Sequence, residues 1–212
     1  MQKIPLNELM RQYPLDFSPP VIIEPRRGPV IPPRLLILAC SATKAEGDAM
    51  PARERYIGPL WQTLKAADPE GRLAYVSYLS ARFGFGDARA DLPNYNQLLT
   101  SKAADTMIER GLHGFYPNYP TDFRTEGARL RHLATRDKLQ TGAKAICDLS
   151  RDLGVQFEDV AICGGKHYVR VAEALIAEMR DEGFIALDAP VTIINDQIGY
   201  MRTKLRRWIE EG

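Results

Sequence analysis

Short apolar runs, separated by longer stretches with a helical pattern, are the feature that most restricts how this chain can fold. The first run, Leu-Leu-Ile-Leu-Ala at 35–39, is too short for a helix and shows no polar–apolar alternation. Such runs are typical of strands that are buried on both faces. Comparable runs at 73–79 and 160–163 predict two more strands, so we expect an α/β fold with a mostly parallel central sheet.

The intervening stretches predict helices on both faces of this sheet, which would give a three-layer, single-domain architecture. The clearest pattern places Val171, Leu175 and Met179 in one apolar stripe. Gly58-Pro59 should kink or divide the first helix. We expect helices at 51–65, 101–109, 130–153, 168–180 and 199–210, a further strand at 191–194 with its lead-in at 184–187, and loops at 80–86, 92–95 and 113–125.

Prolines set the beginning of the chain apart from the rest. Residues 1–33 contain eight of them, which excludes a long helix or a central strand there. We therefore predict a proline-rich N-terminal arm at 1–33, followed by the α/β domain at 34–212. A short helix at 6–11 and an edge strand at 21–23 would fit this arm, and a partly disordered leader is the alternative.

Charge and cysteine content exclude several classes of protein. The chain has 28 Lys and Arg residues against 27 Asp and Glu residues, unlike a strongly basic nucleic-acid binder, although a local basic patch stays open. Cys40, Cys147 and Cys163 lack C-x-x-C spacing, which predicts reduced thiols in the cytoplasm rather than disulfides or a zinc site. With no signal-peptide pattern and no membrane-spanning run, we expect a cytoplasmic protein without a membrane partner, a metal or a cofactor.

Three predicted strands end in small, polar or glycine-rich segments, at 40–44, 80–86 and 163–168. The carboxyl ends of parallel strands meet at one edge of a sheet, and ligands bind there at a switch in strand order. The three segments are therefore expected to form one site.

The first of these segments, Cys40-Ser41-Ala42-Thr43-Lys44, allows two chemistries. A thiol near a helix start and a lysine could be a nucleophile. Alternatively, Ser41 and Lys44 could bind an anion or a base, and we favour this role over nucleophilic attack by Cys40. A buried cysteine followed by a polar turn is the purely structural alternative.

The second segment carries side chains suited to a nucleotide. Arg82 could form paired hydrogen bonds to a carboxylate or phosphate, and Phe83 or Phe85 could stack on a base. Ser80 precedes them at the strand end. A turn that caps the strand is the alternative.

The third segment combines two glycines with a titratable side chain. Gly164 and Gly165 open a helix whose start would favour an anion, and His167 could be a general acid or base. A tight strand-to-helix turn with an exposed histidine is the alternative.

Two other segments are weaker candidates. Asn94-Tyr95-Asn96 could bind the edge of a base, but the pattern favours a turn. The basic run at 202–207 could contact a nucleic-acid backbone, but the pattern favours a solvated helix face.

Four spaced motifs together resemble a family of uncharacterised bacterial and phage α/β domains. Arg82-Phe83 stands where that family often has a lysine and an aromatic residue, and the insertion before Leu130 is longer. The motifs are Leu-Ile-Leu-Ala-Cys-Ser-x-x-Lys at 36–44, Ala52-Arg53-x-x-Tyr56, Leu79-Ser80-Ala81-x-x-Gly84 and Gly165-x-x-Tyr168.

More distantly, the Cys-Ser-x-x-Lys strand end is similar to one in the archaeosine synthase core domain. The YaaA peroxide-stress family and the uracil-DNA glycosylase fold are similar in outline. These resemblances imply a nucleobase or nucleotide ligand. The resulting catalytic candidates are Cys40, Lys44 and His167, and the substrate-binding candidates are Ser41, Arg53, Tyr56, Ser80, Arg82, Tyr95, Asn96, Gly164, Gly165 and Tyr168.

Three functions follow from this set of residues. The leading hypothesis is an enzyme that acts on a nucleobase or its N-glycosidic bond, in nucleic acid (including single strands) or in nucleotides. A non-catalytic nucleic-acid-binding module is the first alternative. A transferase or hydrolase of nucleotides or nucleotide sugars is the second.

Overall fold

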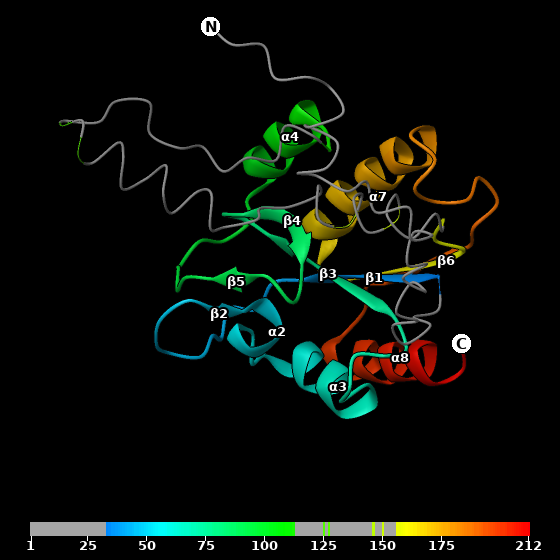
Figure 1. The fold of residues 1–212 in the computed structure, drawn as a ribbon, viewed down its shortest axis with the longest axis horizontal. Coiled ribbons are helices and arrows are strands. Elements are labelled where there is room, and N and C mark those ends of the chain that lie inside the picture. The colour runs from blue at the N-terminus through cyan, green and yellow to red at the C-terminus, as the bar shows by residue number, and fades with distance from the viewer. Residues whose placement is uncertain (1–32, 113–124, 126, 128–145, 147–149, 151–155) are drawn as a thin grey trace, which may run out of the picture. The chain divides into compact units, whose positions relative to one another are not determined.

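The computed structural model describes residues 33–112, 125, 127, 146, 150 and 156–212 (Figure 1). The chain divides into two units, Met1–Val30 and Ile31–Gly212, and every element below belongs to the second. Several predictions fall outside the described residues. They concern the arm at 1–33 apart from Pro33, with its helix and edge strand, almost all of the loop at 113–125, the helix at 130–153 apart from two residues, and Cys147.

Five strands form a sheet with the order β4-β3-β1-β6-β7. β1 pairs in parallel with both β3 and β6, β6 pairs in parallel with β7, and β4 runs antiparallel to β3. The predicted α/β fold with a mostly parallel sheet is thus confirmed. The strands are β1 (Arg34–Ala39), β3 (Tyr75–Ser80), β4 (Gly84–Asp87), β6 (Asp159–Cys163) and β7 (Val191–Ile194).

Helices pack against both faces of this sheet. Figure 1 shows α4 and α7 on one side of the strands and α3 and α8 on the other. A two-residue strand pair, β2 (Met50–Pro51) with β5 (Asp91–Leu92), lies apart from the main sheet. The described helices are α2 (Ala52–Arg55), α3 (Pro59–Ala67), α4 (Ser101–Arg110), α7 (Lys166–Asp181) and α8 (Ile198–Glu210).

β1 is apolar from Leu35 to Ala39 because each of its faces meets a different core. Leu35 and Ile37 join the cluster that contains the buried side chains of α7. Leu36 and Leu38 join the cluster that contains those of α3 and α8. All four are at most 1% exposed, so a polar residue at any of them would be buried without water. This explains why the sequence shows no alternation here.

The loop predicted at 80–86 is partly a strand. Ser80 ends β3, residues 81–83 form a tight turn, and Gly84 begins β4, whose residues pair with Ser77–Ser80 of β3. The Ser80 hydroxyl accepts the N–H groups of Arg82 and Phe83, each at 3.1 Å, and Gly84 has φ of +67°, so the chain reverses within three residues. A glycine is needed at position 86 of β4, because a Cβ atom there would lie 2.5 Å from the Tyr78 hydroxyl oxygen.

Smaller differences concern element boundaries. Leu92, the first residue of the loop predicted at 92–95, belongs to strand β5 instead, because β5 pairs with β2. The region predicted as 184–187 does not extend β7; instead Ile185 forms an isolated bridge with Phe157. The break at Gly58-Pro59 is confirmed, since α3 begins at Pro59. No helix in the described ranges is both long and apolar enough to cross a bilayer.

The strand order reverses at β1. After β1 the chain adds β3 on one side, and only later places β6 on the other. The register pairs Ala39 with Leu79 and Leu38 with Cys163, so the next residues of the three strands lie at one edge. The predicted meeting of the three strand ends is therefore confirmed, and it occurs at the switch point where α/β proteins bind ligands.

Candidate functional site

A thiol, a serine hydroxyl and three phenols meet at this edge, and we call them the thiol–phenol cluster. Cys40 Sγ lies 3.1 Å from Tyr168 Oη. Ser80 Oγ donates to Tyr95 Oη at 2.8 Å, and Tyr95 Oη lies 2.6 Å from Tyr56 Oη. Cys40 is among the causes that raise the pKa of all three phenols, so the thiol is a neighbour of each of them. The cluster therefore joins the ends of β1 and β3 to the first turn of α7.

Backbone pairing positions the two strand-end members. The Cys40 N–H donates to the Leu79 carbonyl at 2.9 Å, which extends the β1–β3 ladder by one residue. Ser80 is completely buried and is held by the tight turn that begins β4. Both side chains consequently have little freedom to leave the edge of the sheet.

Aromatic packing fixes Tyr56 and Tyr95. The Tyr56 ring lies 4.8 Å from Trp61, centroid to centroid, and Trp61 donates through Nε1 to the Ala39 carbonyl at 2.8 Å. The Tyr95 ring meets Phe83 edge-on at 5.0 Å. Because these rings are buried and their neighbours are tied to the backbone, the hydroxyl groups are presented in fixed positions.

Lys44 adds a positive charge beside the phenols. Its Nζ lies 4.3 Å from the centroid of the Tyr95 ring and 5.9 Å from that of Tyr56. The backbone of Lys44 forms an isolated antiparallel bridge with Tyr56. Within the described ranges no carboxylate pairs with its ammonium group, so the charge is held by aromatic faces and is free to meet an anionic ligand.

Burial keeps the phenols protonated. It is the main cause that raises the pKa of Tyr56, Tyr95 and Tyr168 above the ordinary tyrosine value, and the nearby Cys40 raises the pKa of each further. At neutral pH the three side chains are therefore neutral hydrogen-bond donors and acceptors. They are suited to hold polar atoms of a ligand and unsuited to act as phenolate bases.

Sequence reasoning missed Arg55, which is completely buried. Its guanidinium donates to the carbonyls of Leu92 (3.2 and 3.1 Å), Ala45 (2.5 Å), Gly47 (3.3 Å) and Asp48. These bonds fasten the segment after Lys44 to the segment before Tyr95. Backbone carbonyls carry no residue signature, so no pattern in the sequence could have revealed this role.

Gly164 allows the β6–α7 turn to approach β1 closely. A Cβ atom on Gly164 would lie 2.6 Å from the Ala39 Cβ atom and 3.1 Å from that of Tyr168. Gly165, the N-cap of α7, is exposed and has no atom within 4 Å of such a Cβ position. Gly164 thus brings Tyr168 to Cys40, whereas Gly165 faces open space.

Four other candidates follow or adjoin the strand ends, and none of their side chains has a described hydrogen bond to the cluster. Arg82 is exposed, with its guanidinium 5.7 Å from the Phe83 ring centroid. Asn96 is exposed, and the Ser41 hydroxyl accepts the Thr43 N–H at 3.1 Å. His167 is half-buried, and its Nδ1 atom is buried without a hydrogen-bond partner among the described residues.

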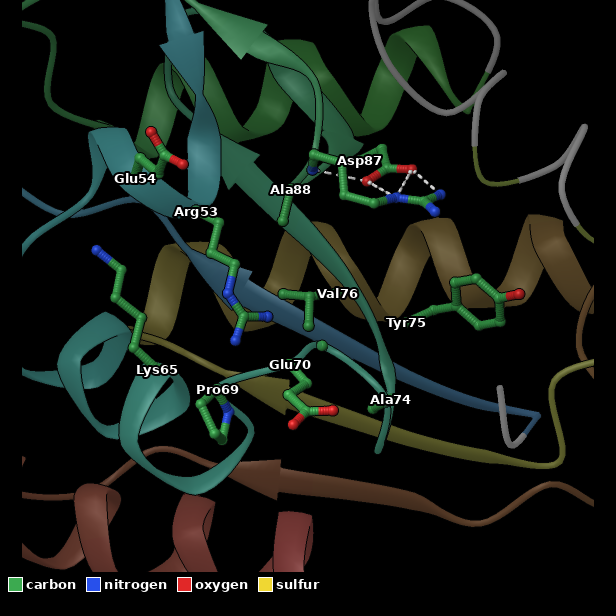
Figure 2. Close-up of a pocket in the computed structure, with 12 residues that line it drawn as sticks. Arg53, Glu54, Lys65, Pro69, Glu70, Ala74, Tyr75, Val76, Asp87 and Ala88 are labelled. Atoms are coloured by element: carbon green, nitrogen blue, oxygen red, sulfur yellow. Dashed lines mark hydrogen bonds and ion pairs between the residues drawn. The ribbon is translucent and has the colours of Figure 1, made fainter. Parts of the chain in front are cut away.

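Two further residues lie apart from the cluster. Arg53 lines a pocket beside the start of β3, whereas Ser80 of the cluster is the last residue of that strand (Figure 2). Cys163 is buried in the apolar core beneath α3 and α8, and burial raises the pKa of its thiol to about 12. It therefore packs as a small apolar side chain.

The described residues include no group of three His, Cys, Asp or Glu side chains that could hold a metal ion. Fold and site together define a mostly parallel α/β protein with a thiol–phenol cluster at the switch point of its sheet. Comparison with family models, curated proteins and solved structures found no match for this chain.

Proposed function

We propose that the thiol–phenol cluster is the substrate site of an enzyme that acts on a nucleobase or its N-glycosidic bond, built on a single three-layer α/β domain. The observation that carries the proposal is the meeting of Cys40, the three phenols and Lys44 at the switch point of the sheet. Residues that only pack a core are mostly apolar, whereas a ligand site at the switch point of an α/β sheet contains a few polar and charged groups that converge. The cluster has the second composition.

The chemistry of the cluster suits a planar, polar ligand. Neutral phenols can donate to carbonyl oxygens and ring nitrogens, or accept from amino groups, all of which nucleobases carry. Lys44 supplies a charge for a phosphate, or for the negative charge that develops on a base as its glycosidic bond breaks. The resemblance of the strand ends to enzymes that act on nucleobases favours a base over other planar ligands.

In this proposal each side chain has a distinct role. Tyr95 and Tyr168 orient the base through hydrogen bonds, and Ser80 and Tyr56 hold Tyr95 in place. Lys44 stabilises negative charge. Cys40, beside Tyr168, contacts the ligand and is the nucleophile if the reaction passes through a covalent intermediate.

Mass spectrometry tests the proposal directly. The full chain is incubated with nucleosides, nucleotides and single-stranded oligonucleotides, and we expect either a new base mass or a released base. Lys44→Met keeps the aliphatic stem but removes the charge, and Cys40→Ser replaces the thiol by a hydroxyl of similar size; each should lower the rate by at least about a hundredfold. Lys102→Met, at an exposed position of α4, is the matched control. Unchanged rates in the first two variants would refute the assigned site.

A non-catalytic nucleic-acid-binding module is the second candidate, because of a basic hollow on another surface. Arg202 and Arg206 line a hollow of about 430 Å³ with Thr63, and Arg202 donates to the Thr63 hydroxyl at 3.1 Å. This candidate predicts binding that weakens steeply with salt, no change in ligand mass, and loss of affinity in Arg206→Ala but not in Lys44→Met.

A further inference from the structure

A second pocket, of about 580 Å³, lies between α2, α3 and the β3–β4 edge of the sheet (Figure 2). Its volume falls within the range of small-molecule sites. Ala74, Val76 and Ala88 give it an apolar wall, and Arg53 and Lys65 reach it from the two helices. The proposed nucleobase function makes no use of this pocket.

Arg53 is held so that part of its guanidinium stays available. Its Nη2 atom donates to the Asp68 carbonyl, and no partner is described for Nε and Nη1. Gly71, with φ of +67°, passes so close that a Cβ atom there would lie 3.2 Å from Nη1. Figure 2 shows the guanidinium directed into the pocket between Val76 and Glu70. A fixed guanidinium with free N–H groups is a receptor for a carboxylate or phosphate.

Lys65 is a second cation in the lining of the pocket, and its ammonium group is turned away from the Arg53 guanidinium (Figure 2). Its Nζ donates to the Tyr56 carbonyl at 3.2 Å, which leaves two of its three N–H groups. Burial first, and then repulsion from Arg53, lowers the pKa of Lys65 from its ordinary value. Glu54 opposes this shift, so the pocket holds one carboxylate that offsets part of the repulsion between the two cations, and a bound anion would offset more of it.

The acidic residues of the pocket are mostly neutralised by other partners. Asp87 accepts three hydrogen bonds from the Arg89 side chain, at 3.0, 3.1 and 2.6 Å. Glu70 pairs with Arg72 at 2.9 Å. Among the acidic lining residues Glu54 alone has no described ion-pair partner, whereas two lining cations, Arg53 and Lys65, have none. The lining carries as many cations as carboxylates, but the charge that these ion pairs leave unpaired is positive.

From this geometry we infer a binding site for a small organic anion, with its phosphate or carboxylate group on Arg53, within the field of Lys65, and its apolar body against Ala74, Val76 and Ala88. Phosphate and carboxylate groups both carry anionic oxygen atoms that accept hydrogen bonds from the Arg53 guanidinium. The size and apolar wall of the pocket call for more than an inorganic ion, because an ion would leave that wall in contact with water.

Titration calorimetry on the full chain, with phenyl phosphate, benzoate and inorganic phosphate at constant ionic strength, tests this site. We expect saturable binding of at least one of the two aromatic anions, with weaker binding of inorganic phosphate; which aromatic anion binds more tightly identifies the head group. Arg53→Ala and Lys65→Met should each lower the affinity roughly tenfold or more. Lys102→Met is the control, and a thermal melt of each variant checks that it is folded.

Amide NMR shifts locate the bound anion independently of the variants. Binding should move the Gly71, Ala74 and Ala88 signals and leave Cys40 and Tyr168 unchanged, so failure of this site and failure of the proposed nucleobase site are separate results. The inference is overturned if neither aromatic anion binds saturably, if folded Arg53→Ala keeps wild-type affinity, or if the shifts map to the thiol–phenol cluster.

Discussion

Replacing Arg55 by methionine tests whether one buried guanidinium holds together the two segments that carry Lys44 and Tyr95. Arg55 makes five hydrogen bonds to the carbonyls of four residues and, in the part of the chain that the structure describes, none to a carboxylate. Methionine fills a similar volume without any donor. The substitution therefore removes the hydrogen bonds while it largely preserves the packing.

The cost can be worked out carbonyl by carbonyl. Gly47 and Asp48 are exposed, so water replaces the lost donor at their carbonyls. Leu92 is 1% exposed and Ala45 is half-buried, so their carbonyls are left without a partner. A buried unsatisfied acceptor costs about 1–3 kcal/mol. Two carbonyls lose their donor, and the half-buried one costs less than the buried one, so we expect a loss of about 2–4 kcal/mol in the free energy of unfolding.

Urea denaturation measures this loss, and hydrogen exchange locates it. Exchange should accelerate at the amide of Ala45, which donates to the Arg55 carbonyl at 2.8 Å, before it does so in β1. Arg55→Lys should recover only part of the stability, since one ammonium cannot reach all four carbonyls. Arg110→Met, at an exposed position of α4, is the control. Wild-type stability and unchanged exchange in Arg55→Met would refute the reasoning.

Three more predictions concern the packing around the sheet. Arg34→Ala removes a largely buried ion pair with Asp159 (3.0 Å) and a stacking contact with Trp208, and should cost about 3 kcal/mol in urea denaturation; an unchanged midpoint would show that these contacts contribute nothing. Gly164→Ala forces a Cβ atom to within 2.6 Å of Ala39 and should cost about 1–3 kcal/mol, whereas its neighbour Gly165→Ala should cost less than about 0.5 kcal/mol; equal effects would contradict the close approach of the turn to β1. Folding raises the pKa values of the three cluster phenols. Their contribution to the free energy of unfolding is therefore complete below the unfolded-state pKa of about 10 and is lost as the pH rises above it. For all three phenols together, the free energy of unfolding should fall by up to about 4 kcal/mol per pH unit. Denaturation between pH 9 and 12 should show this decline, and a slope that Tyr56→Phe leaves unchanged would argue against it.

Local pattern was sufficient for the elements whose residues meet only apolar neighbours. The run at 35–39 lies in β1, the stripe that includes Val171 and Leu175 lies on the buried face of α7, and the break at Gly58-Pro59 separates α2 from α3. In each of these cases the nearest residues along the chain determine the conformation. The turn at 81–83 was harder to predict, because glycines suit both a loop and the antiparallel strand β4.

The sequence by itself determined a mostly parallel α/β sheet and the meeting of its strand ends at one edge, because the period of apolar residues and the direction of parallel strands are enough to imply both. Only the tertiary structure decided which side chains meet there. It brought Tyr56, Tyr95 and Tyr168 to Cys40, placed Arg53 in a separate pocket, and tied Arg55 to carbonyls that leave no mark in the sequence. The physical reason is that the partner of a polar side chain is set by strand order, register and the direction of each Cα–Cβ bond. These depend on residues far apart along the chain.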